Sequence, residues 1–119
     1  MGLFRPATLS EEDTKALIAA KLAWVLKGCE PGEVWVFGSA ARAELTESSD
    51  IDLALIFESL EEMRAARRTL ARTARCDNWP DDILYYTRSD FAGQAQAESA
   101  AMTIRIEGRR LYPPEKDRE

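Results

Sequence analysis

The sequence predicts a single domain of mixed helices and strands, of the α+β class or, in a broader sense, α/β. Its elements follow in the order helix, strand, strand, helix, strand, helix. Three observations support this prediction. A length of 119 residues suits one ordinary hydrophobic core. A composition of 45% apolar residues with only 6 Gly and 5 Pro is typical of globular proteins. Apolar residues recur at helical spacing in some stretches and alternate as in strands in others. We expect the domain to span residues 1–112 and a polar, mobile tail to span 113–119.

The first helix and the first strand have recognisable boundaries. Ser10 followed by Asp13 resembles a capping box at the start of a helix over residues 11–27. Gly28 lies where a glycine commonly ends a helix. Residues 33–37, Glu-Val-Trp-Val-Phe, follow a Pro-Gly turn and have the composition of a strand.

The second strand is predicted over residues 50–57, where apolar residues alternate. One face carries Ile51, Leu53, Leu55 and Phe57. The other face begins with Asp50 and Asp52, followed by Ala54 and Ile56. This pattern favours a half-buried strand whose first two exposed positions are carboxylates.

The rest of the chain predicts an Arg-rich helix over 59–76, a strand over 82–87, and a final helix. Ser89 can cap that last helix, which runs to about Glu107 and is stopped by Gly108. The arginines of the 59–76 helix could meet RNA or an acidic partner. A solvated face suits an acidic protein better.

The absence of histidine excludes several kinds of active site. Without imidazole there is no Ser-His or Cys-His pair, no HExxH zinc site and no histidine proton shuttle. Cys29 and Cys76 lie far apart without a CxxC motif, so we expect two reduced thiols rather than a zinc cluster or a disulfide. Carboxylates, hydroxyls, Lys and Arg are left for catalysis.

Net charge and hydropathy limit the location and the partners. The formal net charge of −5 disfavours non-specific electrostatic binding to nucleic acid, so we expect no direct nucleic-acid binding. The N-terminus lacks the apolar region of a signal peptide, and no stretch approaches the ~20 apolar residues of a membrane span. We therefore expect a cytoplasmic protein without a membrane contact. The sequence does not determine the oligomeric state.

Two carboxylates at the start of the second strand are the first candidate site. Asp50 and Asp52 leave the same face of the strand, about 6–7 Å apart along the chain. Two such groups repel each other unless a cation holds them. Mg²⁺ fits, above all where phosphates complete its coordination. Taken alone, the same pattern also describes two solvated acids.

Three further features strengthen the candidate site. Gly38-Ser39 directly follows a strand, where backbone N–H groups and a hydroxyl can cradle a phosphate. Asp82 opens a later strand and could supply a third carboxylate. Arg42 lies between them and could pair with a phosphate, or with its neighbours as an ordinary surface arginine.

The spacing joins these features into one motif. Gly38-Ser39, ten residues and then Asp50-Ile51-Asp52 read GSAARAELTESSDID. This string resembles the GS-x10-DxD signature of the DNA polymerase β nucleotidyltransferase superfamily, and in particular the small prokaryotic minimal nucleotidyltransferases. The strand at 82–87 and the ending IEGRRLY are similar to segments of the same family. The resemblance covers about residues 14–112.

The resemblance implies a fold and a set of residue roles. The fold would be a nucleotidyltransferase fold, a small mixed sheet with its helices on one face and its acidic edge open to substrate. Gly38 and Ser39 would hold the triphosphate of ATP, and Asp50 and Asp52 would bind two Mg²⁺ ions. Asp82 would ligate the metal nearer the acceptor and help to deprotonate its hydroxyl.

Two positions carry open questions. The family commonly has glycine after the arginine, where this chain has Ala43; alanine fits there unless the backbone needs a positive φ. Asp81 is the rival for the third carboxylate. Asp82 is preferred because the motif alignment places it there, whereas strand parity does not decide which of the two faces inward.

We therefore expect a Mg²⁺-dependent nucleotidyltransferase that transfers a nucleoside monophosphate to a hydroxyl group. The expected nucleotide is AMP, taken from ATP. The resemblance implies an antitoxin role, in which the domain neutralises a separate HEPN-type toxin RNase by adenylylating it. A non-catalytic partner-binding module on the same fold is one alternative, although a pure binder has no reason to keep three repelling acids. A small-molecule nucleotidyltransferase is another, although it usually needs a second domain.

Overall fold

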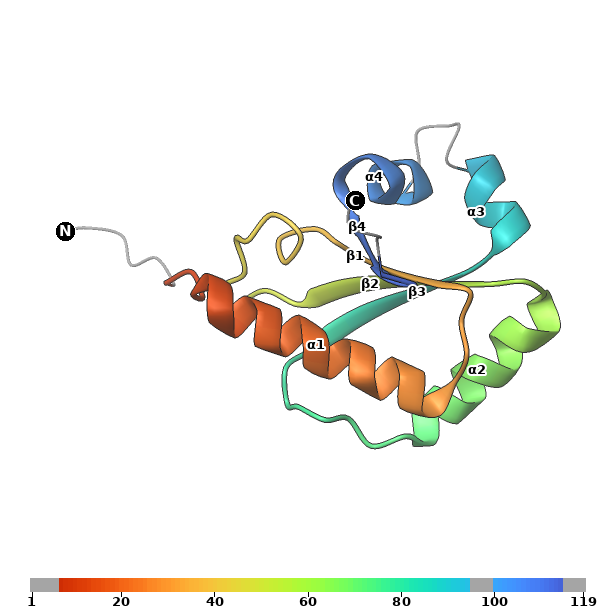
Figure 1. The fold of residues 1–119 in the computed structure, drawn as a ribbon, viewed down its shortest axis with the longest axis horizontal. Helices are drawn as coiled ribbons and strands as arrows, with labels where there is room; N and C mark the ends of the chain where they lie inside the picture. Colours follow the sequence, from red (N-terminus) through yellow and green to blue (C-terminus); the bar gives the residue numbers. More distant parts are fainter. Residues whose placement is uncertain (1–6, 95–99, 115–119) are drawn as a thin grey trace, which may run out of the picture.

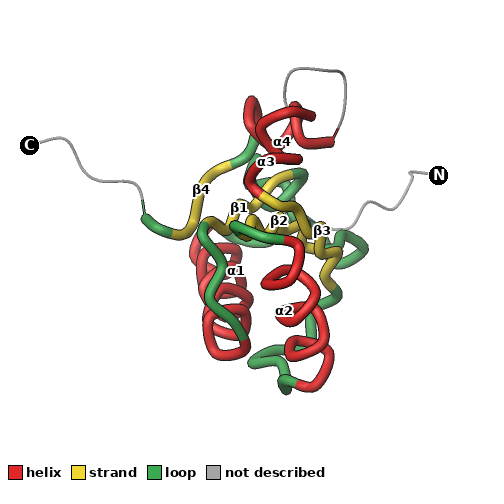
Figure 2. The backbone as a smooth tube through the Cα atoms, turned by 90° about the vertical axis from the view of Figure 1, so that its right-hand side faces the viewer, coloured by secondary structure: helices red, strands yellow, loops and turns green. Residues whose placement is uncertain are grey.

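A computed structural model describes residues 7–94 and 100–114 and shows a four-stranded mixed sheet with helices on both faces (Figures 1 and 2). The strand order is β3-β2-β1-β4. In chain order the elements are α1 (Glu11–Gly28), β1 (Glu33–Phe37), β2 (Ile51–Phe57), α2 (Leu60–Arg72), β3 (Asp81–Thr87), α3 (Arg88–Gln94), α4 (Ala100–Glu107) and β4 (Arg109–Tyr112). The mixed α+β class predicted from the sequence is confirmed.

The pairing of the strands brings distant acids together. β1 runs antiparallel to β2 and to β4, whereas β2 and β3 are parallel. In this register Asp52 lies opposite Phe37 of β1 on one side and opposite Asp82 of β3 on the other. Two of the predicted site residues are therefore direct neighbours across the sheet.

The prediction that all helices pack on one face is wrong. α1 and α2 cover one face, where Leu53 and Leu55 of β2 are fully buried. α3 and α4 cover the other face, on which Ala54 and Ile56 are also fully buried (Figure 2). Beyond Asp52 the second strand is thus buried on both sides rather than half-buried. Two apolar faces need two layers of helix, because exposed apolar area is unfavourable in water.

Most element boundaries match the sequence predictions, with four corrections. The Ser10 side chain accepts from the Asp13 N–H at 3.0 Å, as the capping box predicts. α2 ends at Arg72 rather than at residue 76, and the predicted last helix consists of α3 and α4, with residues 95–99 between them outside the described part. Thr87, not Ser89, caps α3 by accepting from the Asp90 N–H.

The fourth correction is an additional strand. β4 follows Gly108, which ends α4 as predicted by donating its N–H to the Ile104 carbonyl at 2.8 Å. The short Arg109–Tyr112 segment then pairs with β1. Four residues with two arginines carry too little alternation to predict a strand. Most of the predicted tail, residues 115–119, lies outside the described residues.

The two cysteines are free thiols in different surroundings, Cys29 half-buried and Cys76 exposed. Burial raises the pKa of the Cys29 thiol to about 11, so that it stays protonated and unreactive at neutral pH. Among the described residues, no helix has the length and apolar character needed to cross a membrane.

A fully buried lysine connects α1 to the start of β3. The Lys21 ammonium lies 2.7 Å from Asp77 and 2.7 Å from Asp81, and it also donates to the Trp79 carbonyl. Arg75 donates two hydrogen bonds to the Asp81 carboxylate, at 2.7 and 2.9 Å. Burying a charge is unfavourable unless it is paired and hydrogen-bonded. Lys21 and Asp81 meet both conditions, whereas the buried Oδ2 oxygen of Asp77 has no hydrogen-bond partner within the described residues.

Lys21→Met is expected to destabilise the fold by about 3 kcal/mol, because it leaves the buried Asp77 and Asp81 carboxylates short of a cation. Lys27→Met, at an exposed position of the same helix, should cost under about 1 kcal/mol. Urea denaturation of both variants measures the difference. Equal losses would contradict a special role for Lys21.

Candidate active site

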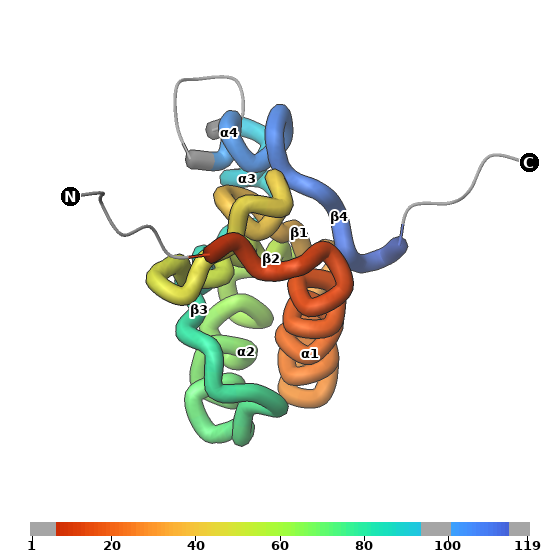
Figure 3. Tube along the Cα trace, turned by 90° about the vertical axis from the view of Figure 1, so that its left-hand side faces the viewer, coloured from red at the N-terminus to blue at the C-terminus, as the bar shows by residue number. Residues whose placement is uncertain are grey.

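The candidate site lies at the end of the sheet where residues 38–50 connect β1 to β2; Figure 3 looks onto this end. Leu45 is fully buried and anchors the middle of this loop. The segment before α1 passes beside it, with the Leu9 N–H donating to the Leu45 carbonyl at 2.8 Å and a bridge joining Thr8 to Thr46. The loop is therefore fastened at both ends and in its middle.

The predicted carboxylates gather at this end. Asp52 and Asp82 are paired across β2 and β3, and Asp50 precedes β2 by one residue. Burial raises the pKa of the Asp52 carboxyl above its usual value, and the charges of Asp82 and Asp50 raise it further. Asp52 thus lies within the electric field of both other acids. The sheet holds together a group of charges that repel one another.

Gly38 makes room for the Asp52 carboxylate. Its φ of +71° belongs to the left-handed region that favours glycine. A Cβ atom at this position would overlap the Asp52 Oδ2 oxygen. Glycine is needed here both for the backbone conformation and for the close approach of the carboxylate. The predicted neighbours Gly38 and Asp52 are therefore in direct contact.

Arg42 lies on the same loop beside acidic groups. Its guanidinium is half-exposed and pairs with Glu44 at 2.9 Å and more distantly with Glu107 at 3.7 Å. Its charge also lowers the pKa of Asp52, against the larger effects that raise it. Ser39 accepts the Glu44 N–H on its backbone carbonyl at 2.8 Å. The phosphate-binding roles of Ser39 and Arg42 remain predictions.

The surroundings of Asp81 and Asp82 differ. The Asp81 side chain is only 5% exposed, and hydrogen bonds from Arg75 and Lys21 lower its pKa although burial opposes this. Asp82 is exposed, with Asp52 as its neighbour on β2. Because adjacent residues of a strand point to opposite faces, only one of the pair can join Asp52. This geometry favours Asp82 as the third carboxylate.

Sequence reasoning missed Lys21 and Arg75, the residues that hold Asp81. A signal for Lys21 was present, since it lies three residues after Ile18 and four before Val25, on the buried face of α1. A charged residue at such a position predicts a buried partner. No comparable signal marks Arg75, which follows the end of α2.

The donor set suits a hard divalent cation. Asp50, Asp52 and Asp82 offer only oxygen atoms, which Mg²⁺ prefers. Burial and the charges of Asp82 and Asp50 raise the pKa of Asp52, and a bound cation would favour its ionised form. Within residues 7–94 and 100–114, no three acidic or cysteine side chains stand close enough together to form a metal cluster as they are. The residues fit the ion chemically, without a preformed cage.

Ala43 adopts the positive φ that an alanine accommodates only with strain. Its φ is +59°, in the left-handed region. A non-glycine residue in this region has its Cβ too close to the backbone, which destabilises the conformation by about 1–2 kcal/mol. The loop keeps this conformation because the Ala43 and Glu44 N–H groups both donate to loop carbonyls, those of Ala40 and Ser39.

A family model and a solved structure that resemble this chain are both described as nucleotidyltransferases. A family model described as "Polymerase beta, Nucleotidyltransferase" matches residues 21–112. A proposed nucleotidyltransferase from Sulfolobus solfataricus has a similar structure, with 18% sequence identity, a TM-score of 0.52, and coverage of 87% of this chain and 89% of that one. At this identity the likeness supports the fold alone. A search of curated proteins found no match.

Ala43→Gly is expected to stabilise the protein by up to about 1 kcal/mol, because glycine adopts the left-handed conformation without strain. Ala41→Gly in the same loop, without a positive φ, should instead destabilise it by about 0.5 kcal/mol through the entropy of the unfolded chain. Chemical denaturation of both variants tests this. A change of the same sign in both would show that Ala43 is not strained.

Asp52→Asn is expected to stabilise the fold at pH 7 by under about 1 kcal/mol, since the group is partly exposed. A raised pKa means that the ionised carboxylate is less favourable in the folded state than in the unfolded chain. The difference from wild type should shrink as the pH falls below that raised pKa and disappear below the ordinary pKa of an aspartate, where the wild-type carboxyl is protonated in both the folded and the unfolded chain.

Thermal melting at pH 7 and at acidic pH measures this difference for Asp52→Asn, with Asp90→Asn as an exposed control that should change little at either pH. An Asp52→Asn variant that melts below wild type at pH 7 would contradict an ionised Asp52 made unfavourable by burial and by the neighbouring acids.

Proposed function

Because this chain belongs to the polymerase β nucleotidyltransferase family, whose domains transfer a nucleoside monophosphate, we propose that it transfers AMP from ATP to a hydroxyl group on a partner protein. The observation that carries the proposal is the pairing of Asp52 with Asp82 directly beside Gly38. Three elements far apart in the sequence contribute to this one place: the end of β1, the start of β2 and the start of β3.

Each residue has a part that follows from its position. Gly38 and Ser39 begin the loop after β1, where backbone N–H groups can receive a phosphate. Arg42, half-exposed on the same loop, can exchange Glu44 for a phosphate oxygen. Asp82 is exposed and can accept the proton of an incoming hydroxyl.

Two Mg²⁺ ions, held by Asp50, Asp52 and Asp82, would neutralise phosphate charge and stabilise the entering and leaving oxygens. The protein's own contribution is positioning. Asp52 is fixed by its place inside the sheet, and Asp82 by the anchoring of the adjacent Asp81. A rigid pair of carboxylates suits a transfer that depends mainly on orientation and charge.

The partner is proposed from the motif. The GS-x10-DxD string resembles that of minimal nucleotidyltransferases, which implies an antitoxin that modifies a HEPN-type toxin RNase. The exposure of Asp82 supports a large acceptor, because a hydroxyl on another protein can reach an open carboxylate.

The test incubates the chain with Mg²⁺ and the product of the neighbouring gene, in parallel with ATP labelled on the α-phosphate and on the γ-phosphate. Only the α-label should be incorporated into the partner. Asp50→Asn and Asp82→Asn should each lower incorporation by on the order of 100-fold or more. Asp90→Asn, which removes an exposed acid of α3 away from the site, should retain full transfer.

Other outcomes separate the alternatives. Incorporation of the γ-label would indicate phosphoryl transfer and contradict the proposal. Toxin neutralisation that is unchanged in Asp50→Asn, without label on the partner, would identify a non-catalytic binding module. Label on a small hydroxyl compound but not on the protein would identify a small-molecule nucleotidyltransferase.

A further inference from the structure

A hollow of about 520 Å³ lies on the α3/α4 side of the sheet, toward the end away from the carboxylates. Glu33 and Ile56, which line it, are paired at one end of the β1–β2 ladder, whereas Phe37 and Asp52 are paired at the other. Ile56 lies four positions along β2 from Asp52, or about 13 Å. The buried residues Phe91 and Ile104 fill the same side of the sheet. The hollow is a separate place from the candidate active site.

Its lining carries an excess of positive charge. Arg88 is neutralised by Glu33 at 2.9 Å and by Glu58 at 2.5 Å. Arg105 and Arg110 also line the hollow, and neither has an acidic partner within the described residues. Among the residues that the structure describes, these two guanidinium groups line the hollow without an acidic partner.

Arg110 has an unsatisfied buried donor. Its Nε atom is buried and has no hydrogen-bond partner in the described part of the chain. A buried N–H group without an acceptor is unfavourable, so such atoms in native proteins call for an explanation. Trp35 is its cross-strand partner on β1, and both residues line the hollow. A bound anion would supply the missing acceptor.

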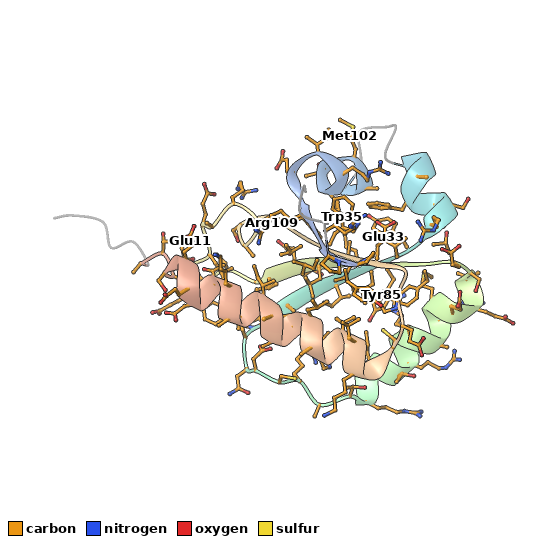
Figure 4. The ribbon with its side chains drawn as sticks, in the orientation of Figure 1. Glu11, Glu33, Trp35, Tyr85, Met102 and Arg109 are labelled. Carbon is orange, nitrogen blue, oxygen red and sulfur yellow. The ribbon has the colours of Figure 1, made fainter. Side chains whose placement is uncertain are left out.

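The aromatic part of the hollow is held in place. The Trp35 indole N–H donates to Glu33 at 2.7 Å, and the ring packs against Phe91 with centroids 6.0 Å apart. Figure 4 shows Trp35 and Glu33 together on the side of the sheet that faces α3 and α4. The Arg105 guanidinium lies over the Phe91 ring at 5.6 Å. A planar ligand would meet a fixed, half-buried indole beside two guanidinium groups.

We propose that this hollow binds a phosphate ester that also carries a planar ring, as a nucleoside monophosphate does, at a site distinct from the carboxylates. Arg105 and Arg110 bind the phosphate, since guanidinium groups match phosphate oxygens in geometry and charge. Trp35 packs against the ring. The volume falls within the range of small-molecule sites. Because the hollow is cationic, it binds its ligand without a metal ion, whereas the acidic site needs one.

That difference defines the experiment. AMP is titrated into the full chain in the presence of EDTA, with calorimetry for the affinity and amide NMR for the location. We expect binding, with shifts at the Trp35 indole and at Arg110 but not at Gly38. Adenosine, which lacks the phosphate, and ribose 5-phosphate, which lacks the ring, should each bind roughly tenfold or more weakly than AMP.

Matched variants test the residues. Arg110→Gln and the exposed Arg105→Gln should each weaken AMP binding by roughly tenfold. Arg109→Gln, which removes the same charge from the adjacent, exposed position of β4 outside the hollow, should bind as wild type. Asp52→Asn should also bind as wild type, so that the outcome is independent of nucleotidyl transfer.

Several results would overturn the proposal. These are no AMP binding at millimolar concentration by the folded chain, shifts confined to the carboxylate end, or equal losses in Arg109→Gln and Arg110→Gln. Ribose 5-phosphate binding as tightly as AMP would overturn the role of the ring. Should Arg110→Gln fail to fold, unchanged affinity in Arg105→Gln would still refute the arginine site.

Discussion

The buried Lys21 of α1 determines which face of the sheet each of the two aspartates of β3 points to. Lys21 and Arg75 hold the Asp81 carboxylate on the α1/α2 side of the sheet. Because consecutive strand residues point to opposite faces, anchoring Asp81 there directs Asp82 to the other face, beside Asp52. A slip of one residue would exchange the two aspartates and place apolar side chains on the wrong faces. An interaction on one side of the sheet thus positions the candidate chemistry on the other.

The loop between β1 and β2 and the start of β2 each carry an unfavourable feature. Ala43 in the loop has a left-handed backbone, and the pKa of Asp52 in β2 is raised by burial and by the charges of Asp82 and Asp50. Such features persist only where the surroundings determine the structure, and they are frequent at functional sites. Here the buried Leu45 and the ladder between β1 and β2 supply that support.

The two faces of the sheet have different tasks. The α1/α2 face holds the larger apolar cluster and the buried ion pairs, and so contributes mainly to stability. The α3/α4 side has acids at one end, around Asp52, and the arginine-lined hollow toward the other. The smaller cluster with Phe91 and Ile104 separates them. Opposite charges at the two ends allow one side of a small sheet to receive different ligands.

The sequence by itself determined the mixed α+β class, most helix and strand positions and the glycine-and-aspartate motif, because local propensity, capping and spacing are written in consecutive residues. Only the tertiary structure decided that helices cover both faces, that β4 completes the sheet, and that Asp81 is anchored while Asp82 is open. The alternation of side chains along a strand does not by itself show which of Asp81 and Asp82 points to which face of the sheet. A partner on one face is needed to decide this. Lys21, sixty residues before Asp81, makes that choice, and contacts over such separations follow from packing rather than from local pattern.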